Sequence, residues 1–267
     1  MNLIWQVIKQ QFLHFDLIFR MSIYEVKSTY KMHYLGALWQ IMNPLLQIGV
    51  YWFVFGIGIR GGAPVGDTPF FLWLITGLVS WLFISPTVTQ ASNSIYSKIN
   101  VVSKMKFPVS VLPSIKIVEN TFTFFIMLII TVVILFINGV FAGVYLLQLI
   151  YYLVCVWVLL FGLTLLFSTL TTIIRDIQSM IQSAMRMMMF TLPIVWNVSN
   201  LPEMMVNLLK LNPFFYIIEG FRDSLLGRHW FYQDLSYTVY FWSVSLLILF
   251  VASSAHLKFR HKFVDYV

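Results

Sequence analysis

Long apolar runs alternate with short polar segments along the chain. The runs reach about 20 residues or more, the length that an α-helix needs to cross the hydrocarbon core of a bilayer. This pattern predicts six membrane-spanning helices, both ends of the chain then lying on one side. We expect the spans at residues 34–59, 70–92, 109–136, 144–171, 180–196 and 237–257.

Before the first span, residues 3–22 have the period of an amphipathic helix. Its apolar face consists of Ile4, Val7, Ile8, Phe12, Phe15, Ile18 and Phe19. Gln6, Lys9, Gln10, Asp16 and Arg20 fall on the opposite face. We expect this helix to lie in the membrane surface rather than cross the bilayer. Charged and polar residues interrupt every apolar run here, so a cleavable signal peptide is not predicted.

Between the last two spans, near residues 201–227, two short helical patterns are separated by Asn212 and Pro213. Gly227 is a natural stop for the second pattern. Each is too short to cross a membrane, so we expect re-entrant helices on the exterior side, with protein or water covering their backbone. Candidate exterior-gate residues are Phe214, Phe215, Glu219, Arg222 and Asp223. The three charged ones lie at helical spacing, so a plain surface ion pair is the alternative.

Composition agrees with an all-α integral membrane protein. Hydrophobic residues make up 60% of the 267 positions and charged residues 10%, against about 25% charged in soluble domains. We expect a single domain over residues 1–267, divided into an interfacial region (1–33), a six-helix membrane domain (34–257) and a cytoplasmic tail (258–267). The single cysteine, Cys155, lies in an apolar run, which excludes a disulfide framework.

Lys and Arg exceed Asp and Glu by 17 to 10. Most of the basic residues fall in the N-terminal region, in the loops 93–107 and 173–178, and in the tail. Because cytoplasmic segments are enriched in Lys and Arg, both termini are predicted to be cytoplasmic. The same rule accounts for the basic surplus, so no nucleic-acid partner is expected, whereas membrane lipids are.

The loop before the third span, VSKMKFPVSVLPSIKIVEN, carries several charges beside apolar sequence. Residues 94–102 predict a short helix, with Ile95, Ile99 and Val102 on one face. Lys98, Lys104 and Lys106 would then face water or acidic partners. Further along, Lys116 and Glu119 share a helix face and can pair. A charge near the bilayer interior must face protein or water. The pair is therefore either a snorkelling lysine with a local partner or part of a polar vestibule.

No energy source or reaction centre is predicted within the chain. It has no GxxxxGK[ST] loop for nucleotide phosphates, and no catalytic, cofactor or metal site follows from residue spacing. A membrane enzyme acting on lipid-linked sugars would need clustered acids or metal ligands, and a proton-coupled carrier would need more buried acids than Glu119. A transporter of this layout needs an external motor, and the 94–102 helix is where such a motor could dock.

Four segments occur in an order that resembles a known family: YLGALWQIMNPLLQIGVYWFVFGIGIR, LITGLVSWLFI, NVVSKMKFPVSVLP and LNPFFYIIEGFRDSLL. They resemble the permease subunit of ABC-2 type polysaccharide exporters, and within that family the teichoic acid translocation permease. Permeases for O-antigen, capsular polysaccharide or other ABC-2 substrates are the alternatives. The resemblance implies two permease copies in a bacterial plasma membrane and two copies of an ABC ATPase, which binds ATP and magnesium. The cargo would be a lipid-linked anionic polymer.

The resemblance also implies roles for individual residues. The 94–102 helix, with Lys98, Lys104 and Lys106 at its edges, would couple to the ATPase. Arg175 and Asp176 would make a second ATPase contact. The N-terminal helix would flank a lateral gate for the lipid-linked polymer.

Two further sets are candidates from their chemistry. Lys9, Arg20, Lys27 and Lys31 are cations available to a pyrophosphate headgroup, the alternative being attraction to anionic lipid. The channel candidates are Tyr51, Trp52, Phe55, Lys116 and Glu119, although most aromatic residues of a membrane protein serve in interfacial belts or helix packing.

Overall fold

The protein is helical throughout the part that the structure describes. This computed structural model describes residues 2–31, 34–59, 61–102, 107–260 and 263. Outside the helices, Val65 and Thr68 form one isolated antiparallel bridge. The α-helices are α1 (Asn2–Leu13), α2 (Phe15–Lys31), α3 (Trp39–Tyr51), α4 (Phe70–Ser92), α5 (Ser94–Val102), α6 (Leu112–Ile137), α7 (Gln148–Ile173), α8 (Asp176–Thr191), α9 (Glu203–Lys210), α10 (Pro213–Leu226) and α11 (Leu235–Phe259).

Short helical segments of other types extend three of these helices. A π-helix, η2 (Trp52–Ile59), continues α3, and two 3-10 segments, η3 (Val109–Val111) and η4 (Gly143–Leu147), precede α6 and α7. With these extensions, five helices of the described chain are long and apolar enough to cross a membrane. They are Trp39–Ile59, Phe70–Ser92, Val109–Ile137, Gly143–Ile173 and Leu235–Phe259.

The sixth predicted span, 180–196, does not reach that length. Helix α8 has 16 residues and ends at Thr191, where Leu192 leaves helical geometry just before Pro193. At 1.5 Å per residue it is about 24 Å long, against a hydrocarbon core of about 30 Å. Proline also disfavours helical geometry in the residue before it, which explains the early stop.

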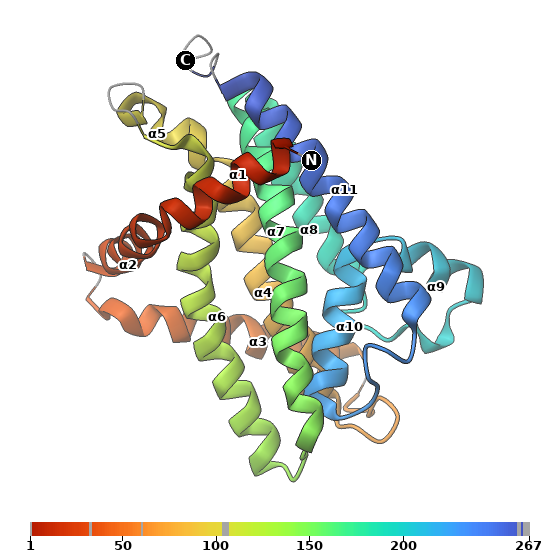
Figure 1. Ribbon diagram of the computed structural model, residues 1–267. Coiled ribbons are helices and arrows are strands. Elements are labelled where there is room, and N and C mark those ends of the chain that lie inside the picture. Colours follow the sequence, from red (N-terminus) through yellow and green to blue (C-terminus); the bar gives the residue numbers. More distant parts are fainter. Residues whose placement is uncertain (1, 32–33, 60, 103–106, 261–262, 264–267) are drawn as a thin grey trace.

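Helix α4 is the centre of the molecule. In its most apolar stretch 78% of the residues are buried, because α6, α7, α8 and α10 pack around it. Helix α11 packs along α7. Figure 1 shows these long helices side by side, with α3 crossing the bundle obliquely. The first span, α3 with η2, has 11% of its most apolar stretch buried and is the least covered of the five.

Several of the predicted cytoplasmic segments lie at one end of the bundle, whereas α2 runs from there along the side of α6 (Figure 1). The N-terminus, α5 and the last described part of the C-terminal region lie together there, and the turn joining α6 to α7 lies at the opposite end (Figure 1). Most of the predicted tail, 258–267, lies outside the described residues.

The N-terminal region forms two helices rather than the single predicted one, with His14 between α1 and α2. Val7 and Ile18 are buried, whereas Phe12, Phe15 and Phe19 are exposed. Hydrogen bonds hold α1 to the start of the third span. Ser110 Oγ donates to Gln10 Oε1 at 2.6 Å, Ser114 Oγ donates to Gln11 Oε1 at 2.8 Å, and Gln11 Nε2 donates to the Ser110 carbonyl at 3.2 Å.

Two short helices separated at Asn212 and Pro213 are confirmed. The side-chain oxygen of Asn212 accepts a hydrogen bond from the Phe214 amide, which caps the first turn of α10. Gly227 ends α10 in the left-handed conformation, with φ 67°. That α9 and α10 enter the membrane from the exterior stays a prediction.

Candidate functional site: a polar cavity among α3, α4, α6 and α8

A cavity of about 910 Å³ lies between the first span and α4, α6 and α8. Its volume is at the upper end of the range for small-molecule sites. Much of the lining is polar although the surrounding helices are apolar. The amide and hydroxyl residues in the lining are Gln40, Asn43, Gln47, Ser85, Thr89, Gln90, Asn93, Ser97, Asn120, Thr123, Gln178 and Gln182.

Helix α3 presents a row of amides to this cavity. Gln40, Asn43 and Gln47 recur three and four positions apart, so they lie on one face of the helix. Tyr51 continues the row. Large apolar residues of the same helix, including Met42, Leu46 and Val50, are exposed instead. Helix α3 therefore turns its polar face to the cavity and its apolar face outward.

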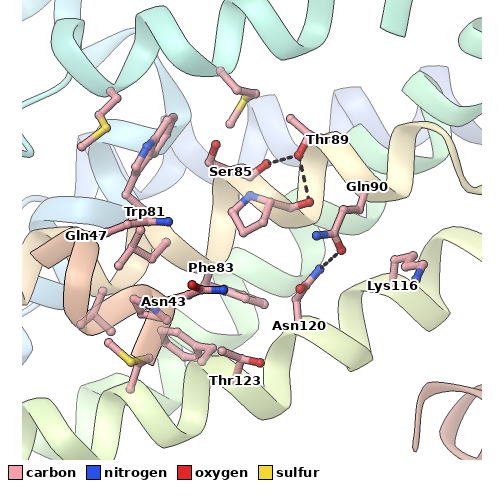
Figure 2. A pocket seen from close by; sticks show the side chains of 18 of the residues that line it. Asn43, Gln47, Trp81, Phe83, Ser85, Thr89, Gln90, Lys116, Asn120 and Thr123 are labelled. Atoms are coloured by element: carbon pink, nitrogen blue, oxygen red, sulfur yellow. Dashed lines mark hydrogen bonds between the residues drawn. The ribbon is translucent and has the colours of Figure 1, made fainter. Parts of the chain in front are cut away.

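Hydrogen bonds fix the opposite wall. Gln178 of α8 accepts from Ser92 Oγ at 2.7 Å and donates to the Thr89 carbonyl at 2.9 Å, which ties α8 to the end of α4. Asn120 of α6 donates to Gln90 Oε1 at 3.2 Å. Figure 2 shows this Asn120–Gln90 pair, with Lys116 at the same end of the pocket. The wall thus offers ordered donors and acceptors of the kind that bind hydroxyl groups.

Lys116 of α6 lines the cavity and carries its charge close to two carboxylates. Its Nζ is 2.7 Å from Glu119 Oε2, so the predicted Lys116–Glu119 pair is confirmed. It is also 3.1 Å from Glu25 Oε2 of α2, and Glu25 forms an ion pair with Lys98 of α5 as well. Glu119 is outside the lining itself. Glu25 was not predicted from the sequence, because nothing local relates it to Lys98 or Lys116.

The three aromatic channel candidates have different positions. Tyr51 lines the cavity and its ring centroid is 6.4 Å from that of Phe55, as expected for two residues on one helix face. Phe55 packs toward Phe190 at 6.5 Å, and Trp52 makes an edge contact with Phe71 at 5.8 Å. Neither Phe55 nor Trp52 belongs to the lining.

The predicted coupling helix, 94–102, matches α5. Its apolar residues Ile95 and Ile99 are buried against Ile18 of α2 and the start of α6, so they hold α5 to its own chain. Of Val102 only the backbone is described, and Lys104 and Lys106 lie outside the described residues.

The second coupling candidate lies beside the first. Arg175 and Asp176, at the corner between α7 and α8, are exposed. The Arg175 guanidinium carbon is 3.5 Å from the centroid of the Tyr96 ring of α5. The two candidate contacts with a motor protein are therefore joined to each other.

The headgroup candidates are spread along the N-terminal helices. Lys9 lies on α1, and Arg20, Lys27 and Lys31 lie on α2, all exposed. They are available to anionic groups, but the structure does not bring them together in one pocket. The lysines that do converge, on Glu25, are Lys98 and Lys116.

The exterior-gate candidates belong to a packed core. Phe214 and Phe215 are buried. Arg222 is fully buried as well, and it forms an ion pair with Glu219. A plain surface ion pair is therefore wrong for Arg222. Its guanidinium carbon is 3.9 Å from the Trp73 ring centroid and Nη2 donates to the Pro193 carbonyl at 2.7 Å. Asp223 lies 3.5 Å from His229 Nδ1.

Sequence reasoning missed the cavity amides, although their spacing carries a signal. Gln40, Asn43 and Gln47 repeat with a helical period inside an otherwise apolar run, and Gln178 and Gln182 are four apart at the start of α8. Polar residues on one face of a membrane helix indicate a protein or water interface. Spacing along one helix does not show which other helices share that interface, because this depends on the tertiary structure.

Five helices long enough to cross a membrane, three of them bordering a polar cavity, are typical of a multi-pass membrane protein that handles a polar substrate. The chain belongs to the ABC-2 type transporter family, whose model matches residues 16–226. Two proteins of Klebsiella pneumoniae named O-antigen export system permease are each 27% identical to it, with 92% of this chain and 93% of each relative covered. A Myxococcus xanthus protein of the same name is 24% identical, over 97% of this chain and 98% of the relative.

Proposed function

We propose that this protein is the permease subunit of an ATP-driven exporter that moves a lipid-linked polysaccharide of the O-antigen type to the outer face of a bacterial plasma membrane. The amide-lined cavity within the membrane-spanning bundle carries the proposal. Amide and hydroxyl side chains match the hydroxyl groups of a sugar chain, since both donate and accept hydrogen bonds. The names of the relatives support the same substrate class.

The cavity favours O-antigen over the teichoic acid that the sequence resemblance suggested. Its cationic lining residues, within the described chain, are Lys116 and Arg186. Lys116 is already paired with Glu25 and Glu119. A polyol-phosphate chain carries a negative charge in each repeat, and this lining offers few cations to balance those charges. An uncharged glycan makes no such demand.

The motor and the assembly are parts of the same proposal. An ABC ATPase with bound ATP and magnesium would dock against α5 and the Arg175–Asp176 corner, where exposed charged groups lie side by side. A second copy of the chain would cover part of the exposed apolar face of α3 and η2. Cargo would enter beside α1 and α2, where Lys9, Arg20, Lys27 and Lys31 face outward.

The test reconstitutes the full chain with its ATPase in vesicles and supplies two cargoes, an uncharged lipid-linked glycan and a lipid-linked polyol phosphate. ATP-dependent export of the glycan is expected to exceed that of the polyol phosphate. The double substitution Asn43→Leu and Gln47→Leu should lower glycan export about tenfold or more, because it removes the polar row of α3. Ile129→Leu with Val133→Leu, on the exposed apolar face of α6 and outside the cavity lining, is the matched control and should change export little.

Two results would contradict the proposal. Preferred export of the polyol phosphate would reinstate teichoic acid as the cargo. Export at the full rate without ATPase or ATP would show that transport does not depend on an ATPase partner.

A further inference from the structure

Three helices meet at one carboxylate near the inner end of the cavity. Glu25 of α2 accepts hydrogen bonds from Lys98 of α5 and Lys116 of α6, the latter at 3.1 Å. Lys116 also donates to Glu119 at 2.7 Å. Two ammonium groups from different helices therefore pair with one carboxylate, Lys98 with Oε1 and Lys116 with Oε2.

We propose that Lys98 and Lys116 form a binding site for a phosphate group, and that Glu25 occupies this site in the present conformation as an internal competitor. Carboxylate and phosphate oxygens accept the same charge-assisted hydrogen bonds, and lysine binds phosphate as a point charge. A pair of ammonium groups arranged around a carboxylate is thus also arranged for a phosphate that displaces it.

The position of the cluster gives a ligand access from two sides. Lys116 lines the cavity, while Glu25 belongs to an N-terminal helix whose phenylalanines are exposed. The side chains of Lys98, Glu25 and Lys116 keep 27%, 22% and 20% of their surface accessible. A phosphate on a lipid carrier would meet this cluster between the surface helix and the cavity. That biological role rests on the proposed function, whereas binding itself does not.

Glu25 is an effective competitor because it is charged at neutral pH. Burial alone would raise its pKa, but the hydrogen bond from Lys98 and the charge of Lys116 more than offset this and lower the pKa below its ordinary value. Removing the carboxylate leaves Lys98, Lys116 and Glu119, a cluster with one net positive charge. If these ion pairs had only a structural role, removing the Glu25 carboxylate would lower the stability of the protein and would not increase its affinity for phosphate.

The experiment measures inorganic pyrophosphate binding to the full-length chain in lipid nanodiscs by calorimetry. Glu25→Gln is expected to bind about tenfold more tightly than the wild type, a difference of about 1.4 kcal/mol. Adding Lys98→Gln and Lys116→Gln to Glu25→Gln should abolish that gain. Lys258→Gln, exposed on α11, is the matched control and should leave affinity within about twofold, since it lies outside the cluster. Thermal unfolding of each variant identifies any that fails to fold, and Glu25→Ala then serves as the second variant.

A second arm replaces pyrophosphate with a polyprenyl pyrophosphate in the nanodisc. Equal gains for both ligands assign the site to the phosphate group alone, and a larger gain for the lipid form assigns it to a lipid headgroup. If Glu25→Gln binds neither ligand more tightly, or if the gain survives loss of both lysines, the proposal is overturned. No ATPase is present in either arm, so this failure is separate from a failure of the export assay.

Discussion

Arg222 shows how a single charged residue is kept inside this bundle. It is fully buried, and its charge is balanced by Glu219, the face of the Trp73 ring and the Pro193 carbonyl. Gly77 of α4 makes room for it, because a Cβ at that position would lie 2.2 Å from Arg222 Nη2. A buried charge is tolerated when it is paired and hydrogen-bonded, and removing its support is costly.

Gly77→Ala is therefore expected to destabilise the protein by about 2–4 kcal/mol, because the new methyl group displaces a buried guanidinium from its partners. Thermal unfolding in detergent measures the change. Gly49→Ala is the control, since a Cβ there meets no atom within 4 Å. Equal melting temperatures for both variants would show that the space beside Gly77, which the Arg222 guanidinium occupies, does not matter for stability.

At the scale of single residues, the sequence predicted pairs on the same helix but not the contacts that these residues make with other helices. The spacing of Lys116 and Glu119 was sufficient to predict their ion pair. The spacing of Glu219 and Arg222 likewise predicted that the two residues can pair. It did not predict that Trp73 and Gly77, which are far away in the sequence, lie against the arginine. Glu25 was missed for the same reason, because its partners lie on other helices.

Helix α5, only nine residues long, contacts several other helices. Ile95 and Ile99 anchor it to α2 and α6, Lys98 pairs with Glu25, and Tyr96 lies under Arg175 at the α7–α8 corner. A displacement of α5 would therefore reach both α2 and the start of α8. These contacts give the proposed motor a direct path to the helices that border the cavity.

Tyr96→Leu is expected to loosen this connection, since a cation–π contact contributes about 0.5–2 kcal/mol. Backbone amides of residues 94–102 and 173–178 should exchange hydrogen about two- to tenfold faster, and export per ATP hydrolysed should fall. Tyr96→Phe keeps the ring and is the matched control. Unchanged exchange in Tyr96→Leu would mean that the two segments are held together by other contacts.

Most elements could be predicted because their apolar runs have clear ends. The predicted 70–92 and 94–102 helices coincide with α4 and α5. The predicted 180–196 span was wrong in its bounds, since α8 begins at Asp176 and ends at Thr191, before Pro193. The apolar residues Leu192, Ile194 and Val195 prolonged the hydrophobic run, but they are buried in a turn rather than in a helix.

For the molecule as a whole, the polar cavity depends on the arrangement of four helices. The sequence placed Tyr51 and Lys116 among the candidates, and both line the cavity. It did not indicate that α3, α4, α6 and α8 meet, because such contacts join residues far apart along the chain. The apolar face of the first span, by contrast, remains exposed and requires lipid or a second chain.

The orientation of the bundle can be tested by thiol labelling of intact cells. A membrane-impermeant maleimide is expected to label Asp67→Cys, in the segment just before α4, and to leave Asp176→Cys unlabelled until the membrane is broken. The basic residues on the α5 side predict this result. Native Cys155 is fully buried and gives no background. Labelling of Asp176→Cys in intact cells would invert the proposed topology and place both termini outside.

The close approach of Arg222 to Gly77 also constrains which substitutions can accumulate at these two positions during evolution. A lineage that acquires a side chain at position 77 while Arg222 is present is expected to pass through a destabilised intermediate, because the new Cβ and the guanidinium would occupy the same space. The arginine must be replaced first, which in turn frees Glu219 and Trp73 from their partner. The glycine and the arginine are therefore expected to be inherited together, and to be lost in that fixed order.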